Sequence, residues 1–224
     1  MRASTAPART GQVLYRDRVQ AGARLAEQLD RFRKEHPVVL GIPRGGVPVA
    51  AEVARRLDGE LDVIVARKLG APWHEELAIG AVTADGSRFL NEDVVSALGV
   101  SDQYLREVTN QQVEEARRRE QRFRKGNGVE LKGRTVILVD DGLATGATMQ
   151  AAARAVRAQG PGRLIVAVPV GSAEAVDALR RQADEVVCLV EPRPLVAIGL
   201  YYQDFAQVED REVLELLGRP RQSA

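Results

Sequence analysis

The sequence is poor in the residues that build disulfides and zinc sites. It contains a single cysteine, Cys188, and only two histidines, His36 and His74. One cysteine excludes an intramolecular disulfide and a multi-cysteine metal site, and two histidines exclude a zinc site of several histidines. Cys188 lies in the run V-V-C-L-V, which predicts a small buried strand residue rather than a nucleophile. Neither a disulfide nor a cysteine- or histidine-based zinc site is therefore expected in this chain.

The chain also has no large excess of one charge and no long apolar segment. The formal net charge is +1, so there is no global attraction to nucleic acid or to a membrane. No stretch approaches the ~18 apolar residues of a membrane span, and the first ten residues lack the apolar run of a secretory signal. We expect a cytoplasmic globular protein in which any anion site is built locally.

Apolar strand-like segments alternate with helical segments along most of the chain. Strands are expected at 38–42, 61–66, 135–139, 163–170 and 185–190, and helices at 19–34, 47–57, 147–159, 173–182 and 210–217. This alternation predicts an α/β fold with a doubly wound, mostly parallel sheet. We expect a single domain over 13–218, with a core at about 36–190. The N-terminal helix and the tail 191–218 would form a cap or hood.

The segment 91–128 departs from the alternation and predicts a helical insertion. Asn91 is the expected cap of a short helix over 92–98, and Ser101 that of a long helix over 102–125. The long helix carries the arginine cluster 117–119, interleaved with glutamates. This pattern favours a solvated helix with local ion pairs over a nucleic-acid surface.

The segment before the insertion predicts a loop and a hairpin. Residues 69–76 are expected to form a loop that holds the only tryptophan, Trp73. Packing under this loop and a role in a substrate lid are both compatible with Trp73. Residues 77–83 and 87–90 flank A-D-G, which is a hairpin signal.

The candidate chemistry is concentrated in T-V-I-L-V-D-D-G-L-A-T-G-A-T, residues 135–148. A β-favouring run leads into Asp140 and Asp141, a turn of small residues follows, and an alanine-rich helix begins near Ala147. The free amides of such a turn and of a helix N-terminus bind phosphate. Carboxylates accept hydrogen bonds from sugar hydroxyls or bind a metal through water. The stretch predicts a site for a phosphorylated sugar, while an acid pair alone can also simply end a strand and cap a helix.

Two further polar features follow other expected strands. The turn P-R-G-G, residues 43–46, follows the strand at 38–42 and forms a second strand–glycine turn–helix unit with a candidate anion nest. Arg67 and Lys68 follow the strand at 61–66. In open α/β sheets, ligands bind at the carboxyl ends of the strands. The alternative for these two cations is a solvated strand end.

The run V-I-L-V-D-D-G-L-A-T-G-A-T resembles the signature of the type I phosphoribosyltransferases, and P-R-G-G is similar to their pyrophosphate loop. With Lys68, the resemblance covers about residues 38–190. The runs R-K-L-G-A-P-W and Y-x-D-F-x-Q resemble a bacterial group described only as phosphoribosyltransferases. The family implies a parallel sheet, a small hood and, here, an inserted long helix. Gly142 departs from the aliphatic residue usual in relatives, so a looser turn is expected there.

The resemblance also implies a reaction. It is the Mg²⁺-dependent transfer of the 5-phosphoribosyl group from phosphoribosyl pyrophosphate (PRPP) to a nitrogen acceptor such as a nucleobase, with release of pyrophosphate, as in nucleotide salvage. Mg²⁺ would come with PRPP and contact Asp140 and Asp141 through water. Relatives also imply a homodimer and a cis or strained peptide entering Arg44. The carried-over roles are ribose binding at Asp140 and Asp141, 5′-phosphate binding at Ala144, Thr145, Gly146, Ala147 and Thr148, pyrophosphate binding at Arg44, Gly45, Gly46, Arg67 and Lys68, and catalytic charge neutralisation by Lys68.

The acceptor side is less defined. Relatives that use hypoxanthine or guanine usually carry an aspartate before T-G, where this chain has Ala144. Alanine cannot handle a purine proton, so the resemblance disfavours the usual 6-oxopurine mechanism, whereas relatives acting on adenine, orotate or uracil tolerate alanine. Candidate acceptor residues are Glu75 and Glu76 as carboxylates, and Tyr201, Tyr202 and Phe205 as stacking groups that alternatively pack on the sheet.

A second hypothesis is a non-catalytic, PRPP- or nucleotide-binding regulatory protein. The long charged helix at 102–125 motivates it, with nucleic-acid binding as one version. Retention of Lys68 favours catalysis, because a sensor has less need of a cation for the leaving group. For the enzyme, small-molecule substrates are the expected partners, and neither nucleic acid nor a membrane is expected.

Overall fold

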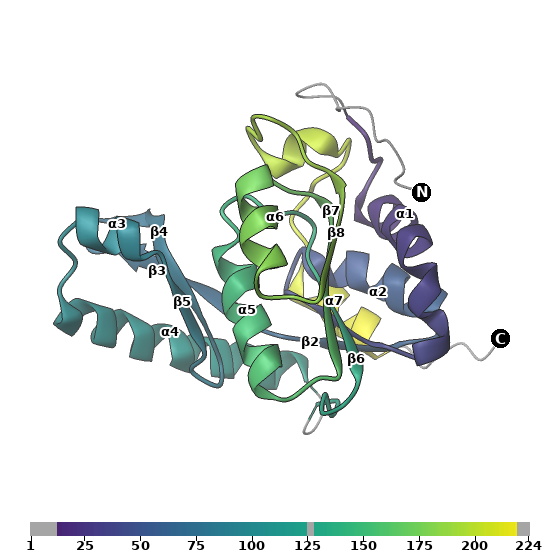
Figure 1. The fold of residues 1–224 in the computed structure, drawn as a ribbon, viewed down its shortest axis with the longest axis horizontal. Coiled ribbons are helices and arrows are strands. Elements are labelled where there is room, and N and C mark those ends of the chain that lie inside the picture. The colour runs from purple at the N-terminus through teal and green to yellow at the C-terminus, as the bar shows by residue number, and fades with distance from the viewer. Residues whose placement is uncertain (1–12, 125–127, 219–224) are drawn as a thin grey trace.

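The computed structural model describes residues 13–124 and 128–218, and its centre is a five-stranded parallel sheet (Figure 1). The strand order is β2-β1-β6-β7-β8. The strands are β1 (Val38–Gly41), β2 (Glu60–Val63), β6 (Thr135–Val139), β7 (Arg163–Val170) and β8 (Glu185–Val190). The expected doubly wound parallel sheet is confirmed.

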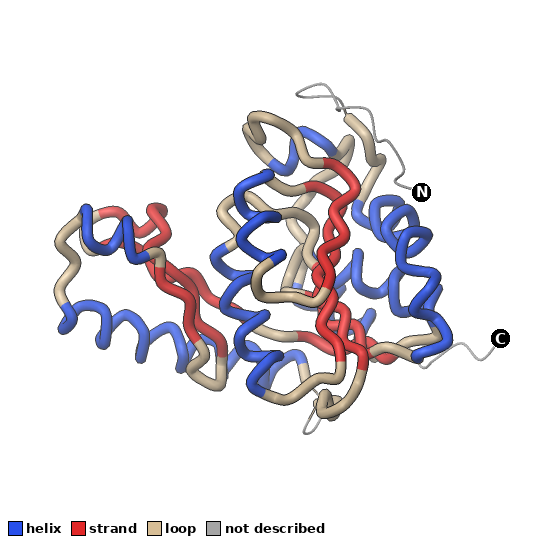
Figure 2. The backbone as a smooth tube through the Cα atoms, viewed as in Figure 1, coloured by secondary structure: helices blue, strands red, loops and turns tan. Residues whose placement is uncertain are grey.

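Helices cover both faces of this sheet. Helices α1 (Arg18–Leu29) and α2 (Gly46–Leu57) lie on one face, and α5 (Ala147–Ala158) and α6 (Ala173–Arg180) lie on the other (Figures 1 and 2). Successive strand side chains point to opposite faces. In β6, Ile137 packs towards α1 and α2, whereas Leu138 packs towards α5. Burial on both faces explains why these strands are continuous apolar runs.

The order of the strands creates a switch point between β1 and β6. These strands are adjacent and parallel, and their crossovers leave in opposite directions, through α2 to β2 and through α5 to β7. In open α/β sheets, the crevice at the carboxyl ends of such a strand pair is where ligands bind. Both glycine turns of the sequence, 43–46 and 140–146, begin at this crevice.

A second sheet and two helices form an arm beside the core (Figure 1). The antiparallel strands β3 (Ala66–Ala71), β4 (His74–Thr83) and β5 (Arg88–Leu90) are followed by α3 (Glu92–Ala97) and α4 (Asp102–Phe123). Helix α4 packs on β3 and β4 through a cluster of buried residues. The cluster contains Leu69, Ala71, Ile79, Val82, Leu105, Val108 and Val113.

The arm corrects two sequence predictions and confirms others. The predicted loop at 69–76 is wrong, because most of it belongs to strands β3 and β4, and Arg67 and Lys68 lie inside β3 rather than after β2. The hairpin at the A-D-G turn is confirmed. Asn91 accepts from the amide of Val94, and Ser101 accepts from the amide of Tyr104, as expected of helix caps.

Helix α4 is a solvated, ion-paired helix in its second half, as predicted. Arg117 pairs with Glu114, and Arg118 and Arg119 both pair with Glu115. The helix ends at Phe123 and Arg124 is extended, so α4 is shorter than the predicted 102–125. Within the described ranges, no helix is long and apolar enough to cross a membrane.

The 3-10 helix η1 (Asp30–Glu35) continues α1, so the expected helix 19–34 is α-helical only to Leu29.

The C-terminal segment returns to the start of the chain. After β8 come the 3-10 helix η2 (Ile198–Tyr201) and α7 (Asp210–Leu217). The amide of Tyr15 donates to the carbonyl of Tyr201 over 2.9 Å, and the rings of Tyr15 and Tyr202 are 5.3 Å apart. The two ends of the described chain therefore pack together beside the switch point.

Candidate functional site

The acid pair lies directly after β6 at the switch point. The amide of Asp141 donates to Asp140 Oδ1 over 2.8 Å, which fixes the first carboxylate against the backbone. Asp141 Oδ2 accepts from Arg18 Nε over 2.7 Å. Burial raises the pKa of Asp140 well above its usual value, and the neighbouring charge of Asp141 raises it further. Burial also raises the pKa of Asp141, although the Arg18 guanidinium opposes this rise.

The two glycine turns meet at these carboxylates. A Cβ on Gly45 would overlap the carboxylate of Asp141, and a Cβ on Gly46 would lie 2.8 Å from the carbonyl oxygen of Val139 and 2.9 Å from Cα of Asp140. Gly45 has an ordinary φ of −61°, so glycine is required there by close approach rather than by backbone conformation. The peptide between Pro43 and Arg44 is cis, as the family resemblance predicts.

The turn before α5 presents free amides. Gly146 caps this helix with a φ of 73°, a left-handed conformation that glycine adopts without strain. Among the described residues, the amides of Gly146, Thr148 and Met149 have no hydrogen-bond acceptor. The amide of Ala147 approaches only Thr145 Oγ1, at 3.5 Å. Unpaired amides at a helix N-terminus are suited to bind a phosphate.

The structure separates Arg67 from Lys68. Directly paired residues of an antiparallel ladder point to the same face. Lys68 is paired with Ala81, which packs against α5, so Lys68 lies on the face of the arm towards that helix. Arg67 lies on the opposite face, where its Nε donates to Gln112 Oε1 of α4 over 3.1 Å. Of the two cations, only Lys68 therefore lies on the face of the arm towards α5, which the turn at 140–146 precedes.

The candidate acceptor residues do not converge on one place as the acid pair and the two glycine turns do. Trp73 lies in the turn between β3 and β4, and Glu75 lies at the start of β4. Trp73 is 91% exposed, so it does not pack under a loop. The side chain of Glu76 lies outside the described residues. Tyr201 and Tyr202 are buried, so both rings pack inside the protein and neither presents an open face to a base.

Arg18 is a site residue that the sequence did not reveal. Besides binding Asp141, its guanidinium lies 3.9 Å from the ring centroid of Phe205, and Nη1 donates to the carbonyl of Ala206 over 2.8 Å. Tyr202 donates its hydroxyl hydrogen to the carbonyl of Asp141 over 2.7 Å. Arg18 of the N-terminal helix and Tyr202 of the C-terminal segment thus both bind Asp141. No local signal identifies Arg18, because its partner is 123 positions away.

The turn after the acid pair is packed rather than loose. Gly142 is buried, and a Cβ there would lie 2.5 Å from Cγ2 of Ile198 in η2. The side chain of Ile198 therefore occupies the space that an aliphatic residue at 142 would need. The expected looser turn at Gly142 is corrected by this contact.

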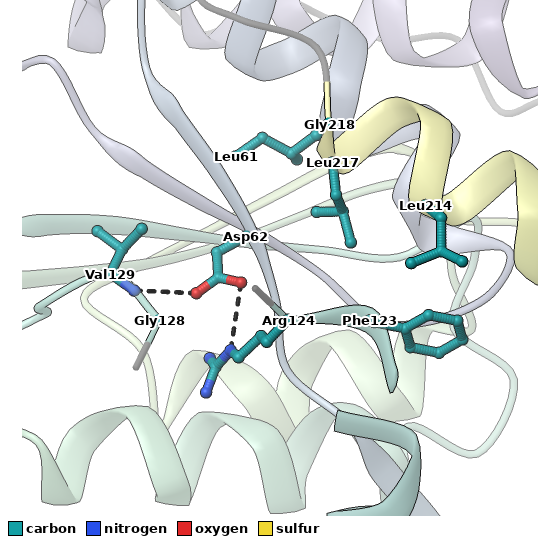
Figure 3. A pocket seen from close by; sticks show the side chains of 9 residues that line it. All are labelled: Leu61, Asp62, Phe123, Arg124, Gly128, Val129, Leu214, Leu217 and Gly218. Atoms are coloured by element: carbon teal, nitrogen blue, oxygen red, sulfur yellow. Dashed lines mark hydrogen bonds and ion pairs between the residues drawn. The ribbon is translucent and has the colours of Figure 1, made fainter. Parts of the chain in front are cut away.

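One cavity of about 260 Å³ lies away from the acid pair, between the end of α4 and α7 (Figure 3). Asp62 lies in its wall and accepts from Arg124 Nε over 3.2 Å and from the amide of Val129 over 3.1 Å. Both carboxylate oxygens are therefore already satisfied by the protein. Asp62 belongs to β2 rather than to a strand end at the switch point, and these contacts indicate a structural role.

The switch-point crevice brings together the acid pair, the turn with free amides before α5 and the second glycine turn on a doubly wound sheet. Residues 11–204 match the family model of the phosphoribosyl transferase domain, and the chain belongs to this family. The resemblance noted in the sequence is thereby confirmed.

Individual relatives agree with this assignment. The chain is 46% identical over 207 residues to a Mycobacterium tuberculosis protein (strain CDC 1551 / Oshkosh) named "Putative phosphoribosyl transferase". A protein of the same description in strain ATCC 25618 / H37Rv matches with the same identity over the same length. These matches cover 92% of this chain but 47% of each relative, so the chain spans about half of their length. The crystal structure of TT1426 from Thermus thermophilus is 49% identical, with a TM-score of 0.77, over 92% of this chain and 98% of that one.

Proposed function

We propose that the chain transfers the 5-phosphoribosyl group of PRPP to a nitrogen acceptor and releases pyrophosphate. The observation that supports this most directly is the meeting of the two glycine turns at one acid pair. Gly45 and Gly46 have no side chain because the backbone and carboxylates of Asp140 and Asp141 occupy that space. A pyrophosphate at one turn and a ribose at the other would then be neighbours, as they are in PRPP.

In this proposal, the turn and the acids hold the ribose phosphate. The amides of Gly146 and Thr148 and the side chain of Thr145 bind the 5′-phosphate, with Ala144 and Ala147 completing the turn. Asp140 and Asp141 accept hydrogen bonds from the 2′- and 3′-hydroxyls. A carboxylate that accepts such bonds is stabilised in its ionised form, which offsets the effect of burial on the pKa of each acid.

The leaving group is held by the other half of the crevice. Arg44 and the backbone of Gly45 and Gly46 bind pyrophosphate, and Lys68 stabilises the charge that develops as the bond to the anomeric carbon breaks. Stabilisation of this kind by positioned cations and amides is a large term in catalysis. The face on which Lys68 lies supports its role, whereas the opposite face of Arg67 makes it a weaker candidate.

The acid pair also fits Mg²⁺ that arrives with PRPP. Mg²⁺ is commonly bound by one or two carboxylates together with substrate phosphates and waters. Among the residues that the structure describes, no group of three metal-binding side chains provides a complete protein site. Asp140 and Asp141 would hold the ion through water, and the bound ion would neutralise part of the pyrophosphate charge.

We propose a nucleobase-like acceptor other than a 6-oxopurine. The residue before T-G is Ala144, whose carbonyl accepts from the hydroxyl of Ser172 over 2.8 Å and whose side chain cannot take a proton. Glu75, exposed in the arm, is the described candidate for an acceptor-side carboxylate.

The test is a panel of nucleobases and small amines with PRPP and Mg²⁺, in which pyrophosphate release is measured. The matched control is the double variant Asp140→Asn and Asp141→Asn, which keeps the shape of the pair and removes both charges. Turnover that depends on the acids supports the proposal. Absence of turnover together with absence of PRPP binding by calorimetry would contradict it, and PRPP binding without turnover would favour a regulatory protein.

A further inference from the structure

A second cavity, of about 360 Å³, lies between α4, α7 and the turn at 43–46. Its lining consists of Arg44, Glu115, Arg118, Arg119, Arg122 and Asp210. Three of the arginines come from α4, where positions 115, 118, 119 and 122 share one face of the helix. Arg44 comes from the turn at 43–46, and Asp210 comes from α7. We call this space the arginine cavity.

The arginine cavity contains more positive charge than its acids balance. Arg118 and Arg119 share the single carboxylate of Glu115, at 2.9 and 3.0 Å. Arg122 and Arg44 share the carboxylate of Asp210, at 2.7 and 3.5 Å. Four guanidiniums are therefore paired with two carboxylates, and the pair between Arg44 and Asp210 is long.

A fifth arginine, Arg67, lies on the α4 face of the arm. Burial lowers its pKa most, the positive charge of Arg119 lowers it further, and Glu115 opposes this change. A guanidinium is planar and donates paired hydrogen bonds, so it binds phosphate oxygens in a fixed geometry. A cluster of such groups that share too few carboxylates is suited to bind an additional anion of high charge density.

We propose that the arginine cavity binds a phosphate group of a small molecule, so that the inserted helix α4 supplies an anion site beside the turn at 43–46. Arg44 would be common to this site and to that turn. The phosphate has two potential sources. One is the pyrophosphate released in the proposed reaction, an identification that rests on the proposed function. The other is a separate phosphorylated ligand, and this identification does not depend on the proposed function.

The test is calorimetric titration of the full chain with pyrophosphate, inorganic phosphate and glycerol phosphate at low and moderate salt. The variant is Arg118→Gln with Arg119→Gln, which removes one charge from the exposed Arg118 and one from the half-buried Arg119 and leaves the apolar core untouched. The matched control is Arg106→Gln, which removes an exposed arginine from the same helix outside the cavity. PRPP turnover is measured separately, so that failure of the proposed function is distinguishable from failure of this site.

We expect the double variant to bind at least one of these anions about tenfold more weakly than the wild type, and the control to bind as the wild type does. Weaker pyrophosphate binding alone identifies the leaving group as the source. Weaker glycerol phosphate binding identifies a separate ligand. Equal affinities of the wild type and the double variant for all three anions would overturn the proposal, as would the absence of binding to the wild type.

Discussion

The carboxylate of Asp141 occupies the space in which a side chain of residue 45 would stand. Gly45 and Asp141 belong to different strand ends, and neither has the space for a larger neighbour. Because Arg18 holds the same carboxylate at 2.7 Å, the acid cannot move aside without losing its ion pair. The turn at 43–46 and the acid pair thus depend on each other for their geometry.

Gly45→Ala tests this dependence. Forcing a methyl group into an occupied space costs about 1–3 kcal/mol, so we expect PRPP binding to weaken about tenfold or more. Calorimetry measures the affinity, and thermal unfolding measures the stability. Gly99→Ala is the control, because Gly99 has a positive φ but no atoms near its Cβ position. That variant should lose stability while keeping its PRPP affinity, and an unchanged affinity in Gly45→Ala would contradict the contact.

Arg18→Met tests the role of the guanidinium behind the acid pair. Burial raises the pKa of Asp141 and Arg18 opposes this rise, so the variant should have a still higher pKa at Asp141. Asp141 must be ionised to bind the ribose hydroxyls. As the pH falls through its pKa, the carboxylate is protonated and this binding is lost. The acidic limb of PRPP binding should therefore move to higher pH.

The measurement is PRPP affinity as a function of pH. Arg16→Met is the matched control, because Arg16 is exposed and pairs with Asp17 rather than with the acid pair. Arg18→Lys should lie between the wild type and Arg18→Met, since it keeps the charge and loses the planar group. Superimposable pH profiles for all of these variants would show that Arg18 does not control Asp141.

Lys68→Met and Arg67→Met form a matched pair on opposite faces of β3. We expect Lys68→Met to lower kcat about 100-fold, because it removes charge stabilisation from the leaving pyrophosphate. The PRPP dissociation constant should change less than kcat does. Arg67→Met should have a much smaller effect on kcat, since Arg67 is turned towards Gln112. Equal losses in both variants would contradict the orientation of the strand.

Asp140→Asn should stabilise the protein while abolishing turnover. Burial and the charge of Asp141 raise the pKa of Asp140 in the folded state. The unfolded chain therefore loses this proton at lower pH than the folded chain. The free energy of unfolding falls as the pH rises from the unfolded pKa to the folded pKa, and it stays lower above that interval.

The substitution removes the cost of burying an ionised carboxylate beside Asp141, and asparagine Oδ1 can still accept a hydrogen bond from the amide of Asp141. Urea unfolding should show that Asp140→Asn is more stable than the wild type above the folded pKa. The gain should disappear at acidic pH, where the wild-type side chain is protonated in both states. A gain that is the same at all pH values would assign the effect to packing instead.

Gly142→Val tests the packing of the C-terminal segment. We expect a loss of about 1–3 kcal/mol of stability, because the new side chain meets Ile198. Ile198→Ala removes the obstructing atoms, so the double variant should be more stable than the sum of the single effects predicts. Additive effects in this double-mutant cycle would show that the two residues do not compete for one space.

The core was predictable from sequence because local pattern and tertiary structure agree there. The strand β6 is found at 135–139, and α5 begins at Ala147, as the apolar run, the turn and the alanine-rich helix predict. The cap residues Asn91 and Ser101 act within three positions of themselves, so their roles are visible locally. The matched family model agrees with the family resemblance that the same run of residues carries.

The arm and the back of the site were not predictable from local pattern. The segment 69–76 is poor in β-branched residues, and its strands form because they pair with each other and pack on α4. The same pairing decides which face Lys68 takes. Arg18 and Ile198 reach the site only through the return of the C-terminal segment to the N-terminal helix, a contact between distant parts of the chain that no local pattern specifies.

The exposed indole of Trp73 gives this protein a natural optical reporter. It is the only tryptophan in the sequence, and it lies in the turn between β3 and β4, at 91% exposure. Its emission therefore reports on the environment of the arm without a background from the core. A ligand or a second copy that covers the arm would shift this emission to the blue, so contacts of the arm can be followed by fluorescence without labelling.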